Sequence, residues 1–117
     1  MTTFTKFADC STEGVSKDIS ELVVSGSPKH TGWPHFVGND GAFRSGVWES
    51  TAGVFEGPMN DQIEFCHIIE GEARIVAGDK EFTVRAGDGF VMDNGLQPIW
   101  HVDNYVKKHF VIVAVPA

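Results

Sequence analysis

The sequence predicts one all-β domain, built as a β-sandwich or a small barrel. Short apolar runs alternate with turn residues, among them 13 glycines. The predicted strands recur about every 8–12 residues, which is typical of sandwiches and barrels. No stretch after Ser45 has the apolar period of a helix. A chain of 117 residues with 42% hydrophobic residues has the size of one domain and can fill one core.

The predicted strands cover most of the chain after Ser45. They span residues 46–51, 54–56, 62–70, 73–77, 81–85, 89–93, 98–103 and 108–115. Gly78-Asp79 is a two-residue turn signal, so it predicts a hairpin between the fourth and fifth strands. The run HFVIVAV near the end is apolar at consecutive positions, so we expect a central strand covered on both faces. We interpret Asp103-Asn104 as a turn.

The first 45 residues are richer in loop signals, such as Pro28, Pro34 and the run Gly38-Asn39-Asp40-Gly41. We expect residues 1–45 to form an N-terminal arm and the first strands, packed on a barrel core of residues 46–117 within one domain. The pattern over 16–24 is compatible with a short helix or a strand. The region can act as a lid over the barrel mouth, an arm exchanged with a partner, or an extra strand.

The charge balance excludes some classes of partner. Asp and Glu number 16 against 9 Lys and Arg, a net charge of −7. Nucleic acids and anionic membranes are bound through basic patches, so neither is expected as a partner. No apolar run is long enough for a membrane span, and the N-terminus lacks the pattern of a signal peptide. The two cysteines are too few for a disulfide framework, so we expect a cytoplasmic protein with free thiols.

Two segments carry a family motif. Residues 64–71 (EFCHIIEG) resemble the second half of the first cupin motif, G-x5-H-x-H-x3,4-E-x6-G, with Gly53 as its first glycine and Glu64 as its glutamate. Residues 87–95 (GDGFVMDNG) resemble the second motif, G-x5-P-x-G-x2-H-x3-N, with both glycines at the correct spacing. The order of GVWE at 46–49, these two segments, Trp100 and VKKHF at 106–110 follows one cupin subgroup.

That subgroup comprises small single-domain, RmlC-like cupins related to ureidoglycine aminohydrolase and to the ethanolamine-utilisation cupins. The resemblance covers about the last 70 residues. It implies a cupin-type double-stranded β-helix, which is a jelly-roll sandwich or barrel, and a homodimer. A dimer would also cover sheet edges and an apolar face that a chain of this size otherwise exposes.

The chain departs from the cupin pattern at the metal-binding histidines. The two histidines of the first motif fall on Pro58 and Asn60 in one spacing and on Gly57 and Met59 in the other. The histidine of the second motif falls on Pro98. A divalent metal needs three or four ligands from His, Asp, Glu or Cys, and only the glutamate remains. We therefore predict no standard metal site and no cofactor; a nonstandard divalent metal at the glutamate stays open.

Strand alternation identifies the candidate site residues. If Glu64 faces the interior, as the resemblance implies, Cys66 also faces inward and His67 faces outward. Trp100 faces inward by its parity with Pro98. The candidate ligand-binding residues are Glu64, Cys66, Trp100 and Asn60. Glu64 is also the candidate catalytic acid or base, because desolvation makes a carboxylate a useful acid near neutral pH.

Each candidate also has a structural interpretation. Glu64 can be a solvated or hydrogen-bonded carboxylate, and Trp100 can be a core residue. Cys66 has no evident basic partner on its face, which favours a buried apolar filler over a nucleophile. Trp48 and Glu49 are adjacent on a strand, so only one of them faces inward.

Four further basic side chains have open or peripheral roles. Lys107 and Lys108 can hold an anionic ligand, pair with acidic neighbours or end a strand in solvent. We place His30 and His35 in the N-terminal loop region.

Three functions remain open from the sequence. The first is a cupin that binds a small polar molecule without the standard metal. The second is an enzyme similar to ureidoglycine aminohydrolase, acting on a small nitrogenous or carboxylated metabolite. The third is a structural or regulatory dimer without catalytic activity. A cavity lined by polar groups favours the first two functions, and a packed interior favours the third.

Overall fold

The computed structural model describes residues 2–116, which form an almost entirely β structure and confirm the predicted fold class. The elements are η1 (Phe7–Asp9), β1 (Val15–Lys17), β2 (Val23–Gly26), β3 (His30–Gly38), η2 (Asn39–Gly41), β4 (Phe43–Glu56), β5 (Gln62–Ala77), β6 (Lys80–Arg85), β7 (Gly89–Met92) and β8 (Ile99–Ala114). The two helices are single 3-10 turns. None of the helices in the described part of the chain has the length and apolar character needed to cross a membrane.

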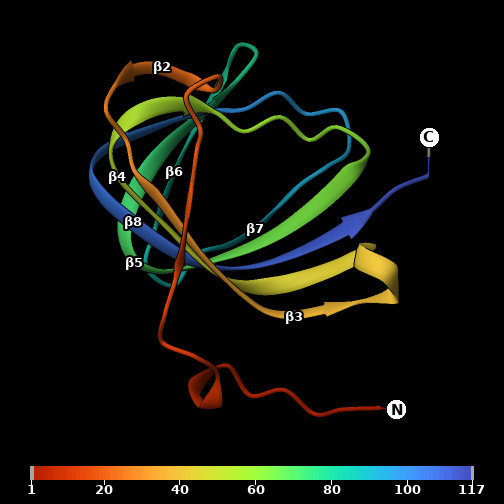
Figure 1. Ribbon diagram of the computed structural model, residues 1–117. Coiled ribbons are helices and arrows are strands. Elements are labelled where there is room, and N and C mark those ends of the chain that lie inside the picture. The colour runs from red at the N-terminus through yellow and green to blue at the C-terminus, as the bar shows by residue number, and fades with distance from the viewer. Residues whose placement is uncertain (1, 117) are drawn as a thin grey trace.

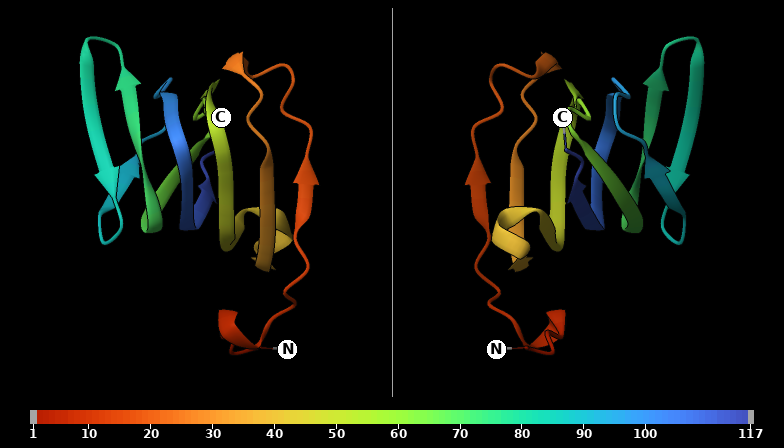
Figure 2. Two further views of the ribbon diagram at one scale, coloured as in Figure 1. Left: turned by 90° about the vertical axis from the view of Figure 1, so that its left-hand side faces the viewer. Right: turned by 90° about the vertical axis from the view of Figure 1, so that its right-hand side faces the viewer.

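The strands form one antiparallel sheet that folds back on itself. Its order is β1-β3-β4-β8-β5-β6, with β2 also paired to β4 and β7 also paired to β5. The first half of β4 pairs with β3 and its second half with β2, while β5 pairs first with β7 and then with β6. The long strands β4, β5 and β8 therefore belong to two layers and curve around a shared interior (Figure 1). Figure 2 shows the same strands side by side in this order.

Bulges allow each long strand to turn from one layer into the other. The register shifts between Thr51 and Gly53 in β4 and again around Gly71 in β5. Gly71 has a φ of 78°, and a Cβ at this position would collide with the carbonyl oxygen of Tyr105. These bulges bend the strands without ending them.

Several predicted strands are therefore halves of longer ones. Residues 46–51 and 54–56 belong to β4, 62–70 and 73–77 to β5, and 98–103 and 108–115 largely to β8. The turn predicted at Asp103-Asn104 is wrong, because both residues lie inside β8. They lie opposite the register shifts of β4 and β5. The hairpin at Gly78-Asp79 is confirmed, since β5 and β6 pair on either side of it.

The core lies between the layers, and the outer face stays partly open. The buried apolar cluster contains Phe55, Met59, Cys66, Ile68, Ala73, Ile75, Val84, Met92, Trp100, Val102 and Val106. The HFVIVAV run lies in β8 except for its last residue, and β8 is central between β4 and β5 as predicted. Its coverage on both faces is not observed, because Val113 is 42% exposed. On the same outer face, the cross-strand partners Val91, Phe65 and Val111 form an apolar row.

The N-terminal region adds strands to the sheet. Residues 16–24 contain the end of β1 and the start of β2, so the strand alternative applies there and the helix does not. His30 and His35 were expected in a loop, but they lie in β3, which pairs with β4 between His30 and Gly38. The segment before β1 hangs below the sheet (Figure 2), where the ring of Phe7 lies 4.9 Å from that of His35.

Candidate functional site

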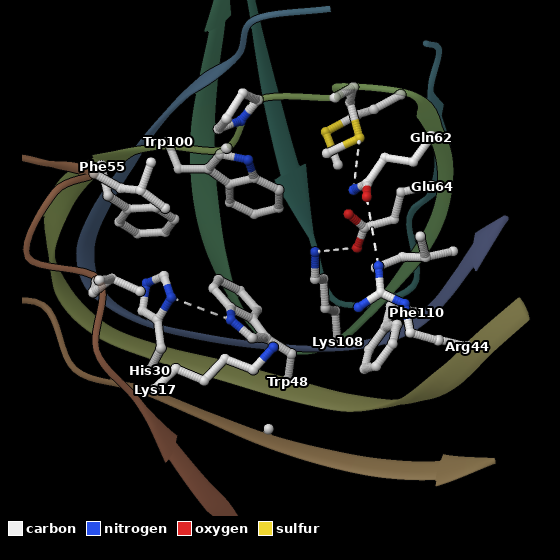
Figure 3. Close-up of a pocket in the computed structure, with 18 of the residues that line it drawn as sticks. Lys17, His30, Arg44, Trp48, Phe55, Gln62, Glu64, Trp100, Lys108 and Phe110 are labelled. Carbon is white, nitrogen blue, oxygen red and sulfur yellow. Dashed lines mark hydrogen bonds and ion pairs between the residues drawn. The ribbon is translucent and has the colours of Figure 1, made fainter. Parts of the chain in front are cut away.

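A cavity of about 400 Å³ lies on the inner face of the folded sheet. Aromatic side chains from β4 and β8 form much of its wall, and charged side chains approach it from β1, β4, β5 and β8 (Figure 3). The aromatic residues are Trp48, Phe55, Trp100 and Phe110, together with Trp33 of β3; the charged ones are Lys17, Arg44, Glu56, Glu64 and Lys108. The interior is thus hollow and partly polar.

Strand register decides which side chains face this cavity. Lys108 of β8 lies opposite Trp48 of β4 on one side and Ile68 of β5 on the other. Directly opposed residues in antiparallel strands project from the same face of a sheet. Since Ile68 is fully buried in the core, Trp48 and Lys108 also face inward. Glu49, next to Trp48, instead accepts a hydrogen bond of 2.7 Å from the Tyr105 hydroxyl.

A buried ion pair forms the floor of the cavity. The Nζ of Lys108 donates to Oε2 of Glu64 at 2.6 Å, and each of the two residues is 5% exposed. Cys66 completes a triangle: Nζ lies 3.4 Å from its Sγ, and the thiol donates to the same Glu64 oxygen at 3.3 Å. All recorded contacts of the carboxylate go to Oε2, so within residues 2–116 the other oxygen, Oε1, stays available to a ligand.

The protonation states in this triangle follow from burial and charge. Burial tends to lower the pKa of Lys108, but Cys66 and Glu64 outweigh it, so the pKa is raised and the ammonium form persists. Burial raises the pKa of the Cys66 thiol to about 12, and the nearby Lys108 charge offsets this only in part. Cys66 is therefore a neutral thiol near pH 7 and is no activated nucleophile.

The expectation that Cys66 has no basic partner is wrong, because Lys108 of the neighbouring strand lies against its thiol. Placing Lys108 at a solvated strand end is also wrong, since its side chain is buried. Pairing with an acidic neighbour, the alternative left open, is what the structure has.

Two indoles enclose the ammonium from its other side. Nζ of Lys108 lies 4.6 Å from the ring centroid of Trp48 and 4.8 Å from that of Trp100. A cation over an aromatic face is attracted to it, and the attraction grows when water is excluded. Figure 3 shows the ammonium directed at the Glu64 carboxylate with both indoles on its other side. This arrangement compensates the cost of burying both charges.

His30 fixes the orientation of Trp48. The indole Nε1 of Trp48 donates to His30 Nδ1 at 3.3 Å. Because Nδ1 accepts this bond, the imidazole is neutral with its proton on Nε2. Burial, followed by the charges of Lys108 and Lys17, lowers the pKa of His30 to about 4. Nε2 is buried and has no hydrogen-bond partner within residues 2–116, although His30 lines the cavity.

The structure brings three of the four predicted site residues together. Glu64 and Trp100 line the cavity, and Cys66 contacts Glu64 from beneath it. Asn60 is set apart: it is exposed, it is not part of the lining, and its side-chain oxygen accepts from Gln97 at 3.2 Å. Sequence reasoning missed His30 and Arg44 as lining residues.

The residues around Glu64 do not fit the metal that cupins commonly hold. Pro58 and Met59 line the cavity and Pro98 is buried beside it, so the histidine positions offer no nitrogen donor. Oε2 of Glu64 is engaged by an ammonium, which repels a metal ion. Across residues 2–116, no group of three or more His, Cys, Asp or Glu side chains is placed to hold a metal ion.

Solved structures with this fold include three related bacterial proteins. A DUF861-family protein of unknown function from Pseudomonas syringae pv. tomato superposes with a TM-score of 0.75 at 22% identity, over 86% of this chain and 44% of that one. The EutQ protein of Clostridium difficile gives 0.67 at 16% identity, over 76% and 65%. An ethanolamine-utilisation protein Q from Salmonella typhimurium gives 0.66 at 15%, over 89% and 96%.

At these identities the structures establish the fold alone, and the chain spans less than two thirds of the first two proteins. No curated protein matches the sequence. The sequence profile of the EutQ-like cupin domain family matches residues 37–110, which contain every strand from β4 to β7 and most of β8. By this match over more than half of its length, the chain belongs to the EutQ-like cupin family.

Proposed function

We propose that this cupin binds a small polar molecule in the cavity above the Glu64–Lys108 pair. The observation that carries the proposal is a buried ion pair that opens on a cavity of about 400 Å³ instead of being sealed by side chains. Binding sites in proteins are typically concave and mostly apolar, with a few fixed polar groups. Here two indoles supply the apolar wall, and Oε1 of Glu64 supplies an acceptor for a ligand donor.

Binding is favoured over catalysis by the protonation states at the site. A general base must be able to take up a proton, and a nucleophile must be activated. Glu64 is engaged by an ammonium at 2.6 Å, and the Cys66 thiol stays protonated because its pKa is raised to about 12. The donor set also does not fit a metal ion. The cavity volume likewise argues against a purely structural role, which would need no empty interior.

A tryptophan-resolved NMR screen tests the proposal. The indole N–H signals of Trp48 and Trp100 report on the cavity wall directly. We expect at least one class in a panel of small carboxylates, amides, amines and alcohols to shift both signals in a saturable way. For ligands that carry a hydrogen-bond donor, Glu64→Gln is expected to weaken binding about tenfold, because a hydrogen bond to a charged acceptor contributes roughly 1.5–3 kcal/mol.

The matched control is Glu49→Gln, which removes a carboxylate that faces away from the cavity and bonds Tyr105. It should leave the ligand affinity unchanged. A panel in which no compound moves either indole signal would contradict the proposed function. Equal losses in both variants would remove Glu64 from the binding site.

We also infer a homodimer through the outer face of β5, β7 and β8. Val91 is 61% exposed and Phe65 is 44% exposed, and they lie in one cross-strand row with Val111. Such an apolar row is costly to leave in water. We expect light scattering to give a dimer mass for the wild-type protein and a monomer mass for Phe65→Asp. Val24→Asp, on the exposed strand β2, should stay dimeric; a monomeric wild-type protein would contradict the inference.

A further inference from the structure

We propose that the ligand of this cavity is a small organic carboxylate whose anionic group is held by Arg44. The inference rests on the proposed function above and specifies the class of ligand. Arg44 belongs to β4, where it lies opposite Ile112 of β8, which in turn lies opposite Glu64 of β5. Arg44 therefore projects from the same inner face as Glu64 and lines the cavity.

Within the described residues, 2–116, the guanidinium of Arg44 forms no ion pair. Among residues 2–116 its side chain forms one hydrogen bond, a long one of 3.5 Å from Nη2 to Oε1 of Gln62. The ion pairs found within residues 2–116 are Arg74–Glu81, Arg85–Glu72 and Lys108–Glu64, so Arg44 forms none of them. A half-buried guanidinium with most of its five donors unused is prepared for an external acceptor.

The charges around the cavity favour an anion. Glu64 is neutralised by Lys108, and Glu56, the other lining carboxylate, is exposed. Besides Arg44, a second cation without an ion pair in the described chain, Lys17, reaches the cavity across Gly32. Gly32 lies beside this path, and a Cβ there would be 3.3 Å from Cε of Lys17. These cations stand out in a chain whose net charge is −7.

The shape of the site indicates a carboxylate attached to an apolar or flat body. A guanidinium fork matches the two oxygens of a carboxylate and binds them in parallel. In Figure 3, Arg44 and Gln62 lie on one side of the Trp48–Lys108 centre and His30 lies on the other. A ligand anchored at Arg44 would thus extend along Phe110 and Trp48 toward His30.

The test compares benzoate with its neutral isostere benzamide, and acetate with acetamide. Binding is followed at pH 7 by the indole N–H signals and by calorimetry. We expect each carboxylate to bind at least about tenfold more tightly than its amide, with benzoate tighter than acetate. Arg44→Gln should abolish the preference. Arg74→Gln removes the same charge from an exposed pair with Glu81 and should preserve it.

The outcomes separate this inference from the proposed function. If amides bind as well as carboxylates, or if Arg44→Gln keeps the preference, the carboxylate assignment is overturned and the cavity remains a binding site. If amines or alcohols from the wider panel bind and no carboxylate does, the carboxylate assignment is likewise overturned and the cavity remains a binding site. If no compound of any class binds at millimolar concentration, the proposed function and this inference fail together.

Discussion

Replacement of Lys108 by methionine is expected to lower the free energy of unfolding by about 3–5 kcal/mol. The substitution keeps an apolar side chain of similar length but removes the ammonium 2.6 Å from Glu64. It leaves a 5%-exposed carboxylate whose one remaining hydrogen-bond donor among residues 2–116 is the Cys66 thiol, and both indoles lose their cation. Removing one partner of a buried ion pair is costly because the other charge stays desolvated. Chemical denaturation followed by tryptophan fluorescence measures the change.

Two further variants make this test specific. Lys107→Met removes the neighbouring charge, whose Nζ lies 5.4 Å from the Trp33 ring centroid, and should cost less than about 1 kcal/mol. The double variant Glu64→Gln/Lys108→Met has no uncompensated charge and should recover a large part of the loss. If Lys108→Met is as stable as the wild-type protein, or if the double variant is no better than the single one, the buried pair does not stabilise the fold as described.

Acidification is expected to destabilise the protein through His30 between about pH 6.5 and pH 4. The pKa of His30 is lowered to about 4 in the folded state, while the pKa of an unfolded histidine is near the ordinary value of 6.5. In this window the unfolded chain binds a proton that the folded chain does not, so stability falls as the pH falls. The contribution is complete above about pH 6.5, is lost below about pH 4, and is on the order of 3 kcal/mol. Free energies of unfolding measured from pH 4 to 7 give this slope.

The contribution of His30 is isolated with His30→Asn, whose side-chain oxygen can still accept from the Trp48 indole. Its stability should depend less steeply on pH than that of the wild-type protein. His109 adds a slope of the same sign, because burial and then the charges of His67, His35 and Lys107 lower its pKa. That part remains in the variant. Identical slopes in both proteins would show that His30 does not titrate in the window.

Alternation along single strands predicted correctly which of the candidate side chains face the interior. Glu64 and Cys66 face inward and Trp100 is buried, as the two-residue period requires. The period also carried a signal for Lys108, which is an even number of residues beyond Trp100 in the same strand. The interpretation of Asp103-Asn104 as a turn breaks the alternation between Trp100 and Lys108, so it hides the inward orientation of Lys108. A bulge bends a strand that then continues, whereas a turn ends it. Local turn propensity does not distinguish a bulge from a turn.

Residue identity by itself determined the all-β class, the hairpin at Gly78-Asp79 and the lack of nitrogen donors at the cupin metal positions, because these depend on local propensities and side-chain chemistry. Only the tertiary structure decided that Lys108 neutralises Glu64, that His30 bonds Trp48, and that Arg44 reaches the cavity without a carboxylate partner in the described chain. The Lys108 and Arg44 contacts depend on register between strands distant in sequence, and the His30 contact depends on the register of β3 against β4. Between strands that no short turn connects, that register is specified by the need to bury one face of each strand against the shared core.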